Sequence, residues 1–207
     1  MSTAIVLDTE TTGLENPQVI EAAYQNIRSD LSAINDRPVC YRFMPNKPIE
    51  QGAINVHGIT LDTLEGMPAS ADLLKHMPGI LYAKYVIGHN IQYDIDAINL
   101  TTGRNGVFKA ICTKRLAYEV LDDQPSYSLV KLCENLNLVC EDILKEAHSA
   151  TFDVYMTTKL IQHIAKTLEQ RTGKTYQCAD LFELYQSLPD MSYEDYKTPK
   201  ADTHTVS

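Results

Sequence analysis

The stretch Thr-Ala-Ile-Val-Leu-Asp-Thr-Glu-Thr-Thr-Gly, residues 3–13, decides the fold that this sequence predicts. Its first part, Thr3–Leu7, is a short apolar run followed by turn-forming residues, a pattern typical of a buried strand that ends at a loop. Asp8 and Glu10 come directly after the run. Because side chains two positions apart in a strand lie on the same face, about 6.6 Å apart, we expect the two carboxylates to point together.

Two carboxylates held together beside apolar surroundings repel each other. Such a pair must bind protons or be neutralised, and a divalent cation with oxygen ligands neutralises it economically. The same two residues could instead be surface acids at a solvated strand end. The motif by itself leaves both interpretations open.

Strands and helices are mixed along the rest of the chain. Further strands are predicted at residues 19–27, 39–44, 85–87 and 107–112, and helices at residues 69–77, 94–100, 128–136 and 149–172. Three strands therefore precede the first sizeable helix. In the longest helix, Val154, Ile161 and Ile164 recur at helical spacing, and Gly173 suits the left-handed residue after the last turn. This order predicts an α/β fold, a mixed sheet flanked by helices.

Length and composition favour a single domain. The chain has 207 residues, of which 44% are hydrophobic, and a chain of this length buries roughly 70% of its unfolded surface without needing a metal or a disulfide. We expect residues 1–174 to form this domain. Residues 175–207 are expected to be a C-terminal extension, with a loosely docked helix around the amphipathic patch 181–188 and a polar tail.

The charge and the cysteine content indicate which binding partners and which cellular compartment are expected. Lys and Arg number 18 against 27 Asp and Glu, and this net charge of −9 argues against tight nonspecific binding of duplex DNA through counterion release. No stretch approaches the ~18 apolar residues that a membrane span needs, and residues 1–10 lack the basic region of a signal peptide. The five cysteines form no CxxC pair, which favours a reducing environment. We therefore expect a cytoplasmic protein without a membrane partner.

A second polar group, His89–Asp94, follows the predicted strand 85–87. Asn90 and Asp94 are four residues apart, so they lie on one side of a helix start. A binding role is one interpretation. The other is an ordinary helix cap, with Asn90 as the cap residue and Asp94 favoured by the helix dipole.

A third candidate pair is His148 with Asp153. Inside one helix, a five-residue step would turn the two side chains about 140° apart, and they could not share a site. His148 is therefore expected to precede the helix and to reach towards a reactive water, while Asp153 projects from the first full turn. The alternative is an exposed loop histidine and a solvated helix acid.

The order and context of these groups resemble a known family, the proofreading-type 3′ to 5′ exonucleases of the DEDDh group (DnaQ-like, exonuclease X-like), which have the ribonuclease H-like fold. The matching stretches are residues 5–14, 19–21, 45–60, 88–94 and 148–153. The resemblance covers about residues 3–170. One departure is Tyr93, at a position where the family more often has a phenylalanine.

The resemblance implies a catalytic set. Asp8, Glu10, Asp94 and Asp153 would hold two Mg²⁺ or Mn²⁺ ions, and His148 would be the general base. Two such ions stabilise the charge that develops when a phosphodiester is hydrolysed. A histidine can also gain and lose a proton near neutral pH.

The resemblance also implies a substrate site. Thr11, Gly13 and Leu14 would form the pocket for the terminal nucleotide, with His57 and Asn90 as further substrate contacts. Leu14 could instead cap the core. His57 could instead be a turn residue ahead of a helix that Thr60 caps.

These observations predict a metal-dependent exonuclease that releases nucleoside 5′-monophosphates from the 3′ ends of single-stranded or frayed DNA, with a role in DNA repair. The alternatives are a 3′ to 5′ exoribonuclease or oligoribonuclease, and an inactive module that binds 3′ ends. Residues 177–182 loosely resemble a sliding-clamp peptide but also fit an amphipathic helix. A polymerase or clamp partner at the C-terminal extension is therefore a further hypothesis.

Overall fold

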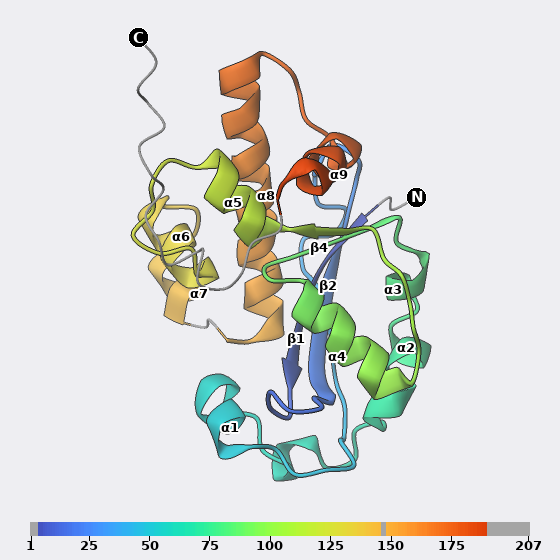
Figure 1. Cartoon of the computed structure of the whole chain (residues 1–207). Coiled ribbons are helices and arrows are strands. Elements are labelled where there is room, and N and C mark those ends of the chain that lie inside the picture. Colours follow the sequence, from blue (N-terminus) through green and yellow to red (C-terminus); the bar gives the residue numbers. More distant parts are fainter. Residues whose placement is uncertain (1–3, 146–147, 190–207) are drawn as a thin grey trace.

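The computed structural model describes residues 4–145 and 148–189, in which helices surround a five-stranded sheet (Figure 1). The strands are β1 (Ala4–Thr11), β2 (Val19–Ile27), β3 (Val39–Arg42), β4 (Tyr85–Gly88) and β5 (Ala110–Cys112), in the order β3-β2-β1-β4-β5. β2 is antiparallel to both β1 and β3, whereas β1, β4 and β5 are parallel. The predicted mixed sheet is confirmed.

Nine α-helices and two short 3-10 helices belong to the described residues. The α-helices are α1 (Gln51–His57), α2 (Leu73–His76), α3 (Gly79–Tyr82), α4 (Gln92–Thr102), α5 (Thr113–Val120), α6 (Leu129–Asn135), α7 (Glu141–Lys145), α8 (Ala150–Thr172) and α9 (Cys178–Ser187). The 3-10 helices are η1 (Asp62–Leu64) and η2 (Ser70–Asp72). α8 ends at Thr172, and Gly173 after it has a φ of 72°, the left-handed conformation predicted for it.

Several predicted boundaries differ from the structure, and the helices α1, α3, α5 and α7 were not predicted. β1 continues through Thr11, because its polar half stays in register with β2 up to an irregularity between Glu10 and Thr11. The strand predicted at 39–44 ends at Arg42, and the one predicted at 107–112 begins only at Ala110. α1 was not predicted, because none of its seven described residues is buried and it therefore has no apolar stripe.

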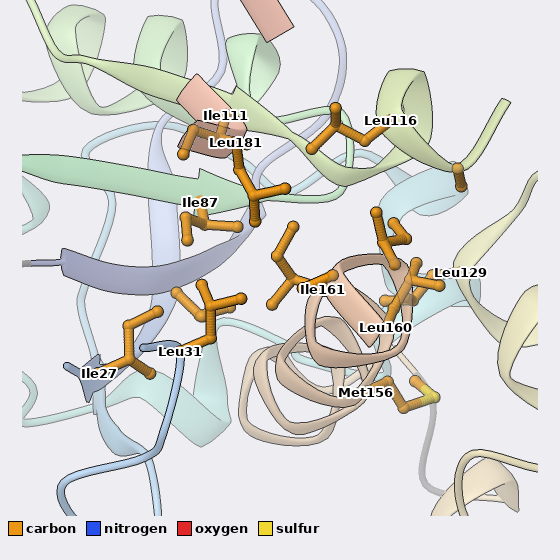
Figure 2. Packing of buried hydrophobic residues seen from close by; sticks show 14 of the residues in the cluster. Ile27, Leu31, Ile87, Ile111, Leu116, Leu129, Met156, Leu160, Ile161 and Leu181 are labelled. Carbon is orange, nitrogen blue, oxygen red and sulfur yellow. The ribbon is translucent and has the colours of Figure 1, made fainter. Parts of the chain in front are cut away.

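The sheet separates two hydrophobic cores, because alternate residues of β1 face opposite sides. Val6 belongs to the core beneath α5, α6, α8 and α9, whereas Ile5 belongs to the core beneath α2, α3 and α4. Figure 2 shows the first core, where Ile161 of α8 lies towards Ile87 of β4. The long helix α8 is therefore fixed against the sheet, and the side chains of its first turn are placed with it.

The C-terminal part of the described chain is packed on the same core. Cys178 and Leu181 of α9 are fully buried, and the Phe182 ring lies 5.5 Å from that of Tyr85. Residues 177–182 thus form an amphipathic helix whose apolar side chains are used in the fold, as one of the two interpretations predicted. The division into a domain of residues 1–174 and an extension stays a prediction, and the polar tail from residue 190 lies outside the described residues.

No helix among the described residues is both long and apolar enough to cross a membrane.

Candidate active site

The acids that the sequence singled out meet at the end of β1 where the parallel strands finish. Asp8 and Glu10 project from β1, and Asp153 projects from the first turn of α8. One carboxylate oxygen from each of the three lies within 4.8 Å of the others. Two segments about 145 residues apart in sequence therefore supply one acidic cluster.

Asp94 lies beside this cluster, in the first turn of α4. Its Oδ1 accepts hydrogen bonds from the backbone N–H of Thr9, at 2.9 Å, and from the Thr9 hydroxyl, at 2.7 Å. The side chain is almost fully buried, so it is not a solvated acid that merely suits the helix dipole. Within the described residues, Asp94 is not part of the three-carboxylate set itself.

The pKa values of the four acids are raised by burial and by their mutual repulsion. Burial raises the pKa of Asp8 well above its usual value, and the charges of Asp94, Asp153 and Glu10 raise it further. Burial, with the Asp153 charge, also raises the pKa of Glu10 to about 9. Burial raises the pKa of Asp94 to about 7 although the bonds from Thr9 oppose the shift, and it raises that of Asp153 to about 6.

These side chains fit a divalent cation with oxygen ligands. Three carboxylates within ligand distance of one another form the donor set that Mg²⁺ and Mn²⁺ prefer. The raised pKa values also favour a cation site, because positive charge placed among the acids would remove the repulsion that favours their protonated forms. Asp94 adds a fourth carboxylate next to the set.

His148 precedes α8, as the five-residue spacing predicted. It is exposed, and its backbone N–H lies 3.3 Å from Oδ1 of Asp153, to which it donates a hydrogen bond. Its φ of 69° is uncommon for a residue other than glycine. This turn brings the His148 backbone to Asp153, while His148 is not part of the three-carboxylate set found among the described residues.

Glu21 is a further site residue whose role the sequence did not reveal. It lies opposite Glu10 in the β1–β2 register and is buried. One carboxylate oxygen accepts from the Arg42 Nε at 2.7 Å, and the other accepts from the backbone N–H of Ala150 at 3.1 Å. Ala150 is the first residue of α8, so Glu21 ties the helix that carries Asp153 to the sheet.

A pocket of about 390 Å³ adjoins Glu10, between the end of β1, α1 and α4. This volume lies within the usual range for ligand sites, ~300–1,000 Å³. Both ends of α1 are tied to the chain where β1 ends: the backbone N–H of Glu50, just before α1, donates to the carbonyl of Thr12, just after β1, at 2.8 Å, and the His57 ring contacts the carbonyl of Thr11, the last residue of β1, at 3.2 Å. α1, which the sequence did not predict, is therefore a wall of the pocket.

His57 lines this pocket with both ring nitrogens engaged inside the protein. Its Nδ1 accepts from the backbone N–H of Ile59 at 3.0 Å, so Nε2 carries the proton and donates to the Thr11 carbonyl. Burial lowers the pKa of His57, which favours this neutral form. It is the last residue of α1, not a turn residue ahead of a helix that Thr60 caps.

The mouth of the pocket carries two large apolar side chains. Leu14 is 81% exposed and Val56 is 54% exposed, and both line the pocket. Leu14 therefore does not cap the core. Exposed apolar side chains that line a pocket are typical of a surface that contacts a ligand.

Asn90 is exposed and has a φ of 69°. Its carbonyl accepts a hydrogen bond from the backbone N–H of Tyr93. The N-cap position of α4 is occupied by Ile91, however, and no side-chain hydrogen bond from the described residues caps this helix start. The helix-cap interpretation of Asn90 is therefore wrong. A role in substrate binding stays a prediction.

The comparison with protein families decides to which family the chain belongs. A family model described as "Exonuclease" (RNase T) matches residues 5–161, which contain the whole acidic cluster. The chain belongs to this exonuclease family. The resemblance found in the sequence is thus confirmed, and so is the expected fold class.

Similar proteins extend this result. The epsilon subunit of DNA polymerase III from Aquifex aeolicus is 25% identical to this exonuclease over 168 residues, or 78% of this chain and 82% of that protein. The PolC-type DNA polymerase III of Oceanobacillus iheyensis is 29% identical over 174 residues, but the match covers only 12% of its length. The chain therefore corresponds to nearly all of one relative and to a small part of the other.

Solved structures show the same fold. Exonuclease X in complex with 5′-overhanging duplex DNA has a TM-score of 0.65 and 25% identity, over 86% of this exonuclease and 99% of that chain. E. coli Exonuclease I in complex with a dT13 oligonucleotide has a TM-score of 0.68 but 18% identity, over 83% and 42% of the two chains. The second likeness supports the fold alone.

Proposed function

We propose that this exonuclease removes nucleoside 5′-monophosphates one at a time from the 3′ ends of single-stranded or frayed DNA. The observation that carries the proposal is the position of the pocket, because Glu10 belongs both to the acidic cluster and to the pocket wall. A nucleotide in the pocket would therefore have its phosphate at the acids. A pocket of this size beside the acidic cluster suits the terminal nucleotide of a DNA strand.

We assign Asp8, Glu10, Asp94 and Asp153 to the binding of two Mg²⁺ or Mn²⁺ ions. When bound, these ions would supply the positive charge that stabilises a phosphodiester during hydrolysis. The carboxylates hold this charge at a fixed place, since β1, α4 and α8 are rigid elements packed on the sheet. The fourth acid, Asp94, is oriented by Thr9.

His148 is assigned as the general base that takes a proton from the attacking water. Its position next to Asp153 and its exposure allow the imidazole to reach a water at the cluster.

The preference for DNA rests on the relatives. The similar subunit and polymerase are named as DNA polymerase III proteins, and the Exonuclease X structure contains DNA. The same relatives support association with a polymerase as a proposal. In the structure, however, α9 uses Leu181 and Phe182 for packing, so a clamp or polymerase would have to bind other parts of the extension.

The test is digestion of a single-stranded DNA oligonucleotide in Mg²⁺, with the label at either end. A 5′ label should give a ladder of progressively shorter products, and a 3′ label should appear at once in a mononucleotide. EDTA should stop both reactions. A circular single strand and a 3′-phosphorylated end should resist cleavage, because neither offers the free end that the pocket takes.

Asp96→Asn provides a matched control for Asp94→Asn, since Asp96 is an exposed acid on the same helix. Only Asp94→Asn should lose activity. Cleavage of the circle, or mononucleotides released first from a 5′ label, would contradict the proposal. Faster digestion of the matching RNA would favour the exoribonuclease, and binding of 3′ ends without hydrolysis would favour the inactive module.

A further inference from the structure

The Tyr93 hydroxyl holds the loop that forms the mouth of the pocket. It donates a hydrogen bond to the carbonyl of Gly13 at 2.9 Å and lies 2.8 Å from the Thr11 hydroxyl. The Thr11 hydroxyl is also 3.1 Å from the same carbonyl. Since a carbonyl only accepts and each hydroxyl has one proton, two hydrogen bonds form at a time: Tyr93 donates to Gly13, and Thr11 donates to Gly13 or to Tyr93.

Thr12 of this loop is anchored by hydrogen bonds with Gln18 and Glu50, and the Tyr93 network acts on the residues on either side of Thr12. Gly13 has a φ of 149°, and a Cβ atom there would lie 2.0 Å from the Glu50 carboxyl carbon. Glycine is favoured here because other residues rarely adopt this φ, whereas the atoms closest to it belong to the end of the flexible Glu50 side chain. Leu14 follows directly and is 81% exposed, so few contacts of its own fix it. Its position depends on the Thr11–Gly13 backbone.

Tyr93 and Asp94 are neighbours in α4, and both hold the end of β1. Asp94 binds Thr9 on the acidic side, and Tyr93 binds Thr11 and Gly13 on the pocket side. A phenylalanine at position 93 would keep the ring but lose the second attachment. Tyr93 also lines the pocket, so the network lies at its surface.

We propose that Tyr93 is a positioning residue for the terminal-nucleotide pocket, whose hydroxyl fixes the Thr11–Leu14 loop so that Leu14 meets the terminal base. This inference rests on the proposed function. Tyr93 then contributes to binding of the terminal nucleotide and not to the chemical step. A net hydrogen bond of ordinary strength corresponds to a change of about three- to tenfold in binding.

The test compares Tyr93→Phe with the full-length wild-type chain on single-stranded DNA in Mg²⁺. We expect KM to rise about three- to tenfold while kcat stays within twofold, and Kd for deoxythymidine 5′-monophosphate, measured by calorimetry with Mn²⁺, to rise by the same factor. Tyr82→Phe is the matched control, because Tyr82 is 82% exposed on α3. It should change none of these values.

A double-mutant cycle shows whether the hydroxyl acts through Leu14. In a Leu14→Ala background, Tyr93→Phe should change KM and Kd less than twofold. Equal increases in both backgrounds, or a loss of kcat with unchanged KM, would overturn the inference. If the wild type binds the mononucleotide but hydrolyses no 3′ end, the proposed function fails, and the calorimetric cycle still decides the role of Tyr93. If the wild type neither binds nor hydrolyses, both fail.

Discussion

The carboxylate of Asp94 and the residue Thr9 are joined by two hydrogen bonds, from the backbone N–H and from the hydroxyl of the threonine. Thr9 lies between Asp8 and Glu10 in β1, but its side chain points away from theirs because side chains alternate along a strand. The contact therefore sets the position of α4 relative to the two acids of β1. It also occupies Oδ1 of Asp94.

Thr9→Val should lower activity more than it lowers stability. The substitution keeps the shape of the buried side chain but removes its hydroxyl, so Asp94 loses one of its two hydrogen bonds from this residue. We expect about 1 kcal/mol less unfolding free energy and a roughly tenfold lower kcat, since misplaced catalytic groups are costly. Thermal melting and single-strand digestion measure the two effects.

Thr101→Val is the control for this prediction. Thr101 is also buried in α4, and its hydroxyl accepts from the backbone N–H of Val19 on β2. It should cost a comparable amount of stability but little kcat. Equal losses of kcat in the two variants would show that Thr9 affects activity only through stability.

Removing one acid from the cluster should separate stability from activity. In Asp8→Asn the fold should survive, and the metal-free protein should melt at the same temperature or higher, because the burial and repulsion that raise the pKa of Asp8 are relieved. Turnover should fall by several orders of magnitude. The wild type should gain thermal stability with Mn²⁺ by mass action, whereas Asp8→Asn should gain much less. Near-normal turnover, or an equal gain, would refute the assigned metal site.

The metal-free protein should become less stable as the pH rises from about 6.5 to about 9. Burial raises the folded-state pKa of Glu10 from 4.5 to about 9 and that of Asp94 from 3.8 to about 7. The folded state therefore binds more protons than the unfolded state in this range, and unfolding free energy decreases with pH. Melting temperatures in EDTA across the range measure this slope.

Glu10→Gln should flatten the slope, and saturating Mn²⁺ should remove most of it. Glu65→Gln, at an exposed glutamate, should leave it unchanged. Below pH 6.5, His89 has the opposite effect on the unfolding free energy. Burial lowers its pKa from 6.5 to about 4, so its contribution to stability is lost as the pH falls from 6.5 to 4. A melting temperature that rises from pH 6.5 to 9 would be inconsistent with the buried acids.

The parts of the site that were predictable from the sequence are those with a local pattern. An apolar run followed by Asp8 and Glu10 fixes a strand with two carboxylates on one face, and the periodicity of α8 fixes where Asp153 and His148 lie relative to the helix start. These side chains are placed by their own elements. Their positions follow from strand and helix geometry alone.

The remaining parts depend on contacts between elements. Glu21 faces Arg42 only because β2 and β3 pair in one register, and it reaches Ala150 only because α8 packs on the sheet. α1 is held by its ends and buries none of its own described residues, so periodicity gives no signal for it. Such features become visible only when the packing is known.

The last prediction concerns His148 as a base. His148→Ala should lower kcat by at least a hundredfold, in line with the usual contribution of a general base. It should leave the affinity for Mn²⁺, measured by calorimetry, almost unchanged, because the three carboxylates that lie within 4.8 Å of one another do not include the histidine. Added imidazole should restore part of the activity, since the exposed position of His148 leaves room for a free base. His163→Ala, on α8 away from the first turn, should neither lose activity to this extent nor respond to imidazole. A parallel loss of metal affinity in His148→Ala would make the histidine a ligand instead of a base.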